Sequence, residues 1–554
     1  MIERLRGRTA MLLASPWTLG LSLSAYLVLL LVVLFPVLAS SVGADDSYWL
    51  MEAAPDSGGS FRRAFWDPFL ASFAFDAQAR MTGLSEASRW VLALAVMKLS
   101  VAFSVPPVAI WALLKVFLLV LALVGAVVFL RAFRFRGADG GAARFGRTTI
   151  VAIVVLLPLL VVLGAKTQSI GTLNGWLNYP TITYGPFGAY LLLAAAALAA
   201  SRLLDARFSR AVVPVAVLAA IAGVAVSFDY ELMALSIPLV VLVLLVQPAP
   251  VAATRWARWR GRVVVGGVFA LAFATSFAWI RVRISQMTCE SAESCYSGTV
   301  LQVDPATLVR NLLGALPGGT GEFLAEQAER SGTPVPTATA ASVLTALGCV
   351  LLAALVLAVL AARTPAAEPG VRPDEARGLL AVVGVGVVNA LGATAITGIS
   401  QRAVESLTSG AMAYRSGVVV WTALAFALAA ALVLAWTRRR RIAGAIAAVA
   451  VAVLAVAVIA TSLPANVVSA QVNRVQAGTV LVDTLHAEVA LGDLSAVGDE
   501  RRCDAILAFM GDRPKDEFSD RFVRTVQGAY RSFQLFYAQP FCSTKAGLDA
   551  TTGS

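Results

Sequence analysis

The sequence predicts an all-α polytopic membrane protein with about 11 transmembrane helices. Hydrophobic residues make up 58% of the 554 residues and charged residues only 14%, and the mean hydropathy is +0.78. A soluble domain cannot hide that much apolar surface. Apolar runs long enough to cross a hydrocarbon core of about 30 Å recur along the chain. Arginine clusters separate them at alternate ends, as the positive-inside rule requires of one consistent orientation.

The formal net charge of +11 is interpreted as a topology signal. The basic residues lie in short clusters between apolar runs, not along one amphipathic face or tail. We therefore expect no nucleic-acid partner. The short inner loops contain no Gly-rich phosphate-binding loop followed by Lys-Ser/Thr, which argues against coupling to a cytoplasmic nucleotide.

The N-terminal segment sets the predicted orientation. Arg4, Arg6 and Arg8 precede an apolar run from about Leu19 to Ala39, which places the N-terminus in the cytoplasm. A cleaved signal peptide is the alternative, although this run is longer than a typical h-region. Further spans are expected near 107–131, 148–165, 187–204, 211–227, 232–247, 263–284, 341–361, 378–400, 417–436 and 442–462. We expect a multi-pass protein of a bacterial inner (plasma) membrane with an extracytoplasmic C-terminus.

The stretch from Trp90 to Ser104 is apolar but is not predicted to cross the bilayer. It carries Lys98 and precedes two prolines. If it crossed, the arginine cluster between Arg131 and Arg147 would fall outside, and every later basic loop would reverse with it. Residues 61–104 are therefore predicted to form interfacial or re-entrant helices in the first outer loop, 43–106.

The chain divides into a transmembrane domain, 1–462, and a small α-helical extracytoplasmic segment, 463–554. Besides 43–106, the larger outer loops are 166–186 and 285–340. Only the outer compartment favours disulfides. Four of the five cysteines fall outside, and two local disulfides are predicted, with free thiols as the alternative. These cysteines are Cys289 and Cys295 in loop 285–340, and Cys503 and Cys542 in the C-terminal segment.

Paired carboxylates follow the first predicted span directly. Asp45 and Asp46 could bind a divalent cation, or one could act as a general base while the other tunes its pKa. The alternative is structural, because Asp46, followed by Ser-Tyr-Trp-Leu-Met-Glu, looks like the N-cap residue of a helix. The only histidine is His486, so a histidine-rich metal site or a Ser-His-Asp triad has little support.

The layout of the chain combines an acidic pair after the first span, interfacial helices, a second span that ends in basic residues, and ten or more spans in total. In these features it resembles the GT-C superfamily of polyprenyl-phosphate-sugar-dependent glycosyltransferases. The resemblance implies inverting transfer, on the outer face, of a sugar from a polyprenyl-phosphate donor to a glycan or glycoconjugate acceptor of the cell envelope. It implies that Asp45 or Asp46 is the base. Some members also bind a metal, and some carry an acidic residue in the second outer loop. The second outer loop of this sequence contains no acidic residue. Asp229 and Glu231 are the substitutes, so the candidate ligands for Mg or Mn are Asp45, Asp46, Asp229 and Glu231.

A lipid-phosphate donor needs cations close to the membrane surface. The candidates at outer span ends are Lys166, Arg281, Arg283, Arg402 and Arg415, each of which could instead be a snorkelling anchor. Loop 166–186 supplies amides and aromatic rings suited to a sugar, although an interfacial aromatic belt predicts the same residues. These candidates are Asn174, Trp176, Asn178, Tyr179 and Tyr184.

Two other function classes remain open. A transporter or flippase of a lipid-linked or anionic substrate would need ionisable groups near mid-span. Apart from Lys98 and Lys115 the spans are nearly free of charge, which argues against ion coupling. A noncatalytic envelope scaffold would depend on residues 463–554 and not on Asp45 and Asp46.

Overall fold

The computed structural model of the protein describes most of the chain. The described residues are 16–38, 44–74, 83–137, 141–164, 184–229, 231–248, 255–286, 302–317, 337–363, 375–399, 401, 404–405, 414–437, 441–475, 477–512 and 519–543. They are almost entirely helical, and their one sheet is a two-residue antiparallel pairing of β1 (Phe135–Arg136) with β2 (Ala142–Ala143). The all-α fold class is therefore confirmed.

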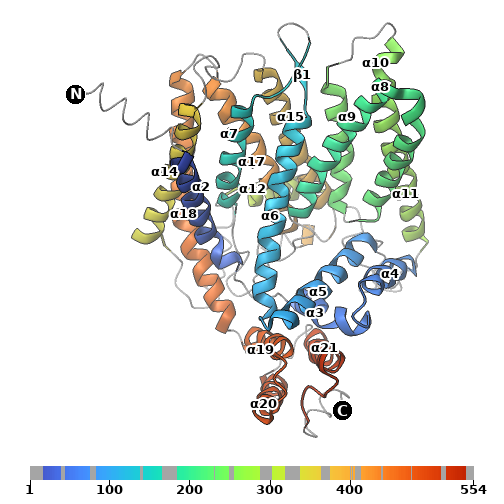
Figure 1. The fold of residues 1–554 in the computed structure, drawn as a ribbon, viewed down its shortest axis with the longest axis vertical. Coiled ribbons are helices and arrows are strands. Elements are labelled where there is room, and N and C mark those ends of the chain that lie inside the picture. Colours follow the sequence, from blue (N-terminus) through green and yellow to red (C-terminus); the bar gives the residue numbers. More distant parts are fainter. Residues whose placement is uncertain are drawn as a thin grey trace.

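Long helices lie side by side and form the body of the molecule (Figure 1). In chain order they are α2 (Pro16–Leu38), α6 (Pro107–Ala132), α7 (Arg147–Leu163), α8 (Tyr184–Ser227), α9 (Ser236–Val246), α10 (Arg255–Arg262), α11 (Val268–Ser285), α14 (Ala340–Arg363), α15 (Glu375–Gly398), α17 (Tyr414–Thr437) and α18 (Arg441–Val475). A π-helical turn, η3 (Val263–Gly267), joins α10 to α11. We call the two ends of this bundle the upper and lower ends, as Figure 1 shows them.

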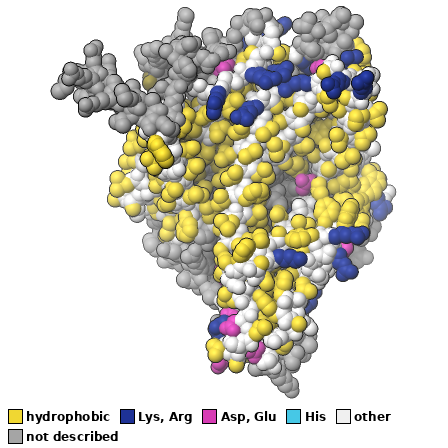
Figure 2. All heavy atoms as spheres, viewed as in Figure 1, with side chains coloured by type: hydrophobic (Ala, Val, Ile, Leu, Met, Phe, Trp, Pro, Cys, Tyr) yellow, Lys and Arg dark blue, Asp and Glu magenta, His cyan; other side chains and the backbone are white. Residues whose placement is uncertain are grey.

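The bundle is apolar enough to occupy a membrane. Among the described residues, seven helices have the length and composition of a membrane span, and α7, α9 and α17 supply shorter apolar helices. Helix α8 contains two of the predicted spans, because it bends at Arg207, whose φ and ψ are −142° and 50°. Large apolar side chains cover the outside of the bundle in a broad belt (Figure 2). The prediction of a multi-pass membrane protein is confirmed, whereas the number of crossings stays a prediction.

Basic residues gather at the upper end of the bundle (Figure 2). Hydrogen bonds connect the segment after α6 with the segment after α9 at this end. Gln247 donates to the Arg134 carbonyl over 2.9 Å and accepts from the Arg134 N–H over 3.1 Å. Burial, and then the nearby Arg144, lower the pKa of Arg134. Glu375 is buried at the start of α15 and accepts hydrogen bonds from the Gly146 N–H and from the Thr149 hydroxyl, so it ties α7 to α15.

Helix α12 (Pro305–Ala315) packs against both α15 and α17 although its sequence belongs to predicted outer loop 285–340. Its N-cap is Asp304, whose carboxylate accepts from the N–H groups of Ala306 and Thr307 at 3.2 and 3.0 Å. A further hydrogen bond from the Thr307 hydroxyl is the main reason that the pKa of Asp304 lies below its usual value. The capped helix is anchored by Asn311, which donates to the Thr394 carbonyl of α15 over 3.1 Å.

Helices α15 and α17 approach each other closely at Gly386. A Cβ atom there would lie 2.6 Å from the Ala423 carbonyl oxygen and 2.7 Å from the Ala427 Cβ. Small residues allow such close packing of helices in membranes, where dispersion contacts replace the hydrophobic driving force.

We expect Gly386→Val to separate α15 from α17 and to destabilise the protein by about 1–3 kcal/mol, because the clash involves backbone atoms that cannot rotate away. Thermal unfolding of the detergent-solubilised protein would measure the loss. Gly384→Val is the matched control, since a Cβ at Gly384 would meet nothing within 4 Å. Equal destabilisation by both variants would contradict this account.

The lower end carries the helices of the first predicted outer loop. They are α3 (Ala44–Asp56), α4 (Phe61–Ala71), η1 (Ser72–Ala74) and α5 (Gly83–Phe103), and they run obliquely across the end of the bundle (Figure 1). Helix α4 buries Ala64 but exposes the side chains of Trp66 and Leu70. Such exposure of large apolar groups is typical of a helix that lies in a membrane interface.

A C-terminal lobe caps the lower end and consists of α19 (Ala477–Leu491), α20 (Ala496–Asp512), α21 (Ser519–Tyr537) and residues 538–543. Figure 1 shows it directly below α3 and α5. Helix α18 runs through residue 462 to Val475, so the predicted boundary between the two domains falls inside a helix. Among its described residues the lobe has no separate core. Its apolar residues share one cluster with α3, α5 and the beginning of α6.

Candidate functional site

The acidic pair lies at the lower end, in the first turn of α3. The helix begins at Ala44, so Asp45 and Asp46 lie inside the helix and do not precede it as an N-cap would. Negative charge is stabilised in a first helical turn, where the unpaired N–H groups and the helix dipole are positive. The backbone of both residues is described, whereas their side chains lie outside the described part of the structure.

The rest of α3 is fixed by its neighbours. Leu50, Met51, Ala53 and Ala54 are completely buried against α5 and α21. A short, buried helix with one apolar face is held by this packing and not by intrinsic propensity, because isolated helices of this length are unstable in water. The acidic pair is therefore mounted on a helix whose position depends on the C-terminal lobe.

Lys115 is a buried cation close to the same segment, and it was not among the predicted site residues. It lies on α6, its side chain is completely buried, and its Nζ is 3.5 Å from the carbonyl oxygen of Leu38, the last residue of α2. A cation at this position offsets the negative end of the α2 dipole. The sequence feature that could have identified Lys115 is a single lysine inside an apolar run, because such a charge is costly in a membrane unless it has a partner.

Asp229 lies at a second corner of the lower end, in the turn after α8. Its neighbour Phe228 contacts Phe73 of η1 and Trp279 of α11, with ring centroids 5.3 and 6.4 Å apart. The Leu84 N–H of α5 donates to the Phe228 carbonyl oxygen over 2.9 Å. These contacts bring the first predicted outer loop onto the turn that carries Asp229.

Two of the predicted phosphate-binding arginines lie near this corner. Arg281 and Arg283 lie near the C-terminal end of α11, with Arg283 in its last turn, beside Ile280 and Ile284, which pack with Phe228 and Leu84. Arg281 is half-buried and Arg283 is exposed. The structure thus places these two cations and Asp229 at one corner of the lower end.

Helix α5 connects the two parts of the site. Leu84 at its beginning contacts the Asp229 corner, and Leu94 is buried in the cluster that holds α3. Ten residues of helix separate the two contacts by about 15 Å. The acidic pair and the two arginines therefore share the lower end, but no described contact joins them directly.

The remaining predicted site residues fall partly or wholly outside the described residues. The backbone of Tyr184, Glu231 and Arg415 is described, at the starts of α8, η2 (Glu231–Leu235) and α17, but their side chains are not. The residues that lie wholly outside are Lys166, Asn174, Trp176, Asn178, Tyr179, Cys289, Cys295 and Arg402. Among the four candidate metal ligands, only the side chain of Asp229 is described.

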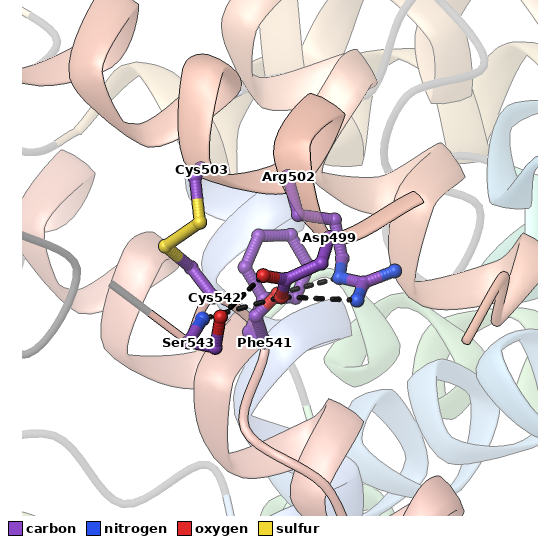
Figure 3. Close-up of a disulfide and its surroundings, with 6 residues drawn as sticks. All are labelled: Asp499, Arg502, Cys503, Phe541, Cys542 and Ser543. Atoms are coloured by element: carbon purple, nitrogen blue, oxygen red, sulfur yellow. Dashed lines mark hydrogen bonds and ion pairs between the residues drawn. A yellow bond between two sulfur atoms is a disulfide. The ribbon is translucent and has the colours of Figure 1, made fainter. Parts of the chain in front are cut away.

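The C-terminal lobe contains one of the two predicted disulfides. Cys503 of α20 is bonded to Cys542, with a Cα–Cα distance of 5.0 Å. Cys349 is a buried free cysteine on α14, in agreement with the prediction that it is an apolar residue of a span. Figure 3 shows the bridge beside the buried side chain of Arg502.

Arg502 organises the lobe from within. Its Nε donates to the Phe541 carbonyl over 2.5 Å, its Nη1 donates to the Asp493 carbonyl, and its Nη2 lies 3.4 Å from Asp499 Oδ1. The guanidinium also lies over the Phe533 ring of α21, 4.4 Å from the centroid. One cation therefore ties α20, α21 and the terminal residues together.

These helices define the class of the protein as a helical, multi-pass membrane protein with a disulfide-linked C-terminal lobe packed on one end of the bundle. Comparison of the chain with family models, curated proteins and solved structures finds no match.

Proposed function

We propose that the protein is a GT-C-like glycosyltransferase that transfers a sugar from a polyprenyl-phosphate donor to a cell-envelope acceptor at the lower end of the bundle. The observation that carries the proposal is the placement of Asp45 and Asp46 in the first turn of α3, immediately after α2 and beneath the apolar belt. A carboxylate at that depth can meet both a lipid-linked donor in the membrane and a polar acceptor in water.

The proposed reaction is an inverting displacement. Asp45 or Asp46 takes the proton from an acceptor hydroxyl, whose oxygen forms a bond to the anomeric carbon of the sugar. The bond between that carbon and the phosphate oxygen breaks, and the electron pair leaves with the polyprenyl phosphate. Arg281 and Arg283 are suited to stabilise the charge that develops on this leaving phosphate, together with Lys166, Arg402 and Arg415.

The proposed topology has eleven crossings, a cytoplasmic N-terminus and an extracytoplasmic lower end in a bacterial plasma membrane. The concentration of basic residues at the upper end supports this orientation, because loops rich in Lys and Arg remain in the cytoplasm. The bend of α8 at Arg207 supports the proposed number of crossings, because it divides one 44-residue helix into two segments of membrane-spanning length.

We expect Asp45→Asn or Asp46→Asn to reduce sugar transfer by at least about a hundredfold, since removal of a general base typically costs 10²–10⁴-fold in rate. Both variants should be produced as folded protein, because the amide matches the carboxylate in shape. Transfer from radiolabelled polyprenyl-phosphate sugars to envelope glycan by protein in liposomes would measure the loss, and Asp504→Asn on the exposed surface of α20 is the control.

Full transfer by both variants would refute the proposed mechanism. Movement of the labelled lipid across the bilayer without a covalent product would favour the transporter or flippase alternative. If substitution of both carboxylates leaves the cellular phenotype unchanged while deletion of residues 463–554 alters it, the scaffold alternative is favoured.

A further inference from the structure

The C-terminal lobe packs on the helices of the first predicted outer loop where α21 crosses α3. Gly528 of α21 lies directly on Met51, so that a Cβ at Gly528 would be 2.7 Å from the Met51 Cβ and 3.1 Å from its carbonyl carbon. Only glycine permits two helix backbones to approach this closely. At this point the two helices are separated by little more than the contact distance of their backbones and the Met51 Cβ.

Polar contacts lock the register of this crossing. Ser532, one turn after Gly528, is completely buried and donates its hydroxyl to the Met51 carbonyl oxygen over 2.8 Å. Arg531 lies at the edge, with Nη1 2.6 Å from Asp56 Oδ1 and Nη2 3.5 Å from Glu52 Oε1. The Arg531 guanidinium is exposed, whereas the Glu52 side chain is largely buried. Ion pairs with an exposed cation contribute little energy individually, but together with the hydroxyl they oppose sliding of α3 along α21.

The position of α21 is in turn fixed from the far side. Phe533 packs against Phe541 with ring centroids 5.5 Å apart, and Arg502 covers the Phe533 ring. The Cys503–Cys542 bridge holds Phe541 against α20 (Figure 3). A continuous set of contacts therefore runs from the disulfide through α21 to the middle of α3, less than two helical turns from the acidic pair.

We propose that α21 is a positioning element of the active site, in which Gly528 and Ser532 hold α3 so that its first turn presents Asp45 and Asp46 to the reacting groups. The inference rests on the proposed function for its catalytic consequence, whereas its mechanical part stands independently. Gly528, Arg531 and Ser532 are positioning residues that act through α3. The lobe thereby becomes part of the catalytic unit, since the reaction requires a base held within a fraction of an ångström.

The experiment compares Gly528→Ala with Gln534→Ala, an exposed position on the same helix, in full-length protein in liposomes. Alanine is a better helix former than glycine, so any loosening by Gly528→Ala must come from the clash with Met51. Hydrogen–deuterium exchange is expected to accelerate at least about tenfold in residues 44–50 and to remain unchanged in α6 and α15. The Arg531→Gln/Ser532→Ala double variant, which introduces no clash, should show the same pattern to a lesser degree.

The sugar-transfer assay supplies the second readout. We expect Gly528→Ala to lower kcat at least about fivefold and to leave the KM for the donor within twofold, because the base is displaced while the donor site is intact. Unchanged exchange in residues 44–50 in both variants would overturn the inference, as would a change in the donor KM alone. If wild-type protein transfers no sugar, the proposed function fails, and the exchange experiment still decides whether α21 positions α3.

Discussion

Arg502→Gln is expected to destabilise the C-terminal lobe by about 3–5 kcal/mol, as is usual when one partner of a buried ionic network is removed. The shorter, neutral amide cannot reach both the Phe541 and the Asp493 carbonyl groups, and it leaves Asp499 without the guanidinium. Amide hydrogen exchange in α20 and α21 should accelerate by about a hundredfold to a few thousandfold. This range is the same loss of free energy converted into a change of the local opening equilibrium.

The adjacent residue provides the control for this experiment. Arg501 is exposed and forms ion pairs with Glu488 at 3.2 Å and with Asp493 at 3.0 Å. The Arg501 side chain is exposed to water, although that of Glu488 is largely buried. Because the exposed guanidinium keeps most of its hydration, Arg501→Gln should accelerate exchange in the lobe much less than Arg502→Gln does. Arg502→Lys should fall between the two, because lysine keeps the charge but not the planar fork that serves two acceptors. A similar effect of the glutamine substitution at both positions would contradict the role assigned to Arg502.

Much of the fold was predictable because membrane helices are specified locally. Apolar length identifies each helix without knowledge of its neighbours, and every predicted span lies on a helix of the structure. Helix α5 runs obliquely in the structure, whereas the prediction that residues 90–104 do not cross rests on the alternation of the basic loops and stays a prediction. The course of α18 through residue 462 was not predictable in this way, because a span and the polar helix that continues it look like separate segments in hydropathy.

The candidate site was less predictable, because its geometry depends on contacts between distant residues. The acidic pair can be recognised from its place after the first span, but nothing near Asp45 indicates that α21, almost five hundred residues later, fixes its helix. Gly528 is an ordinary glycine in the sequence and acquires its role only through Met51. Lys115 was visible as a lone charge, but its proximity to the Leu38 carbonyl depends on how α2 and α6 pack.

The Cys503–Cys542 bridge links the stability of the lobe to the compartment in which it lies. The two residues are 39 positions apart. Closing a loop of that length in the unfolded chain is worth about 4 kcal/mol on the chain-entropy model, and measured values are typically about 2–4 kcal/mol. We therefore expect Cys503→Ala and Cys542→Ala each to accelerate hydrogen exchange in α20 and α21 roughly thirtyfold to eight-hundredfold. Cys349→Ala in α14 is the control, because this cysteine is not bridged and should leave exchange in the lobe unchanged.

The same bridge tests the orientation of the whole bundle. Disulfides persist in oxidising compartments and are rare in the cytoplasm. In intact cells, a membrane-impermeant reductant followed by an impermeant maleimide should label Cys503 and Cys542, and omission of the reductant should abolish the labelling. Labelling that requires permeabilisation, or free thiols at both positions before reduction, would place the lobe in the cytoplasm. Because the lobe and α3 share one core, that result would also move Asp45 and Asp46 to the cytoplasmic face and exclude the proposed transfer on the outer surface.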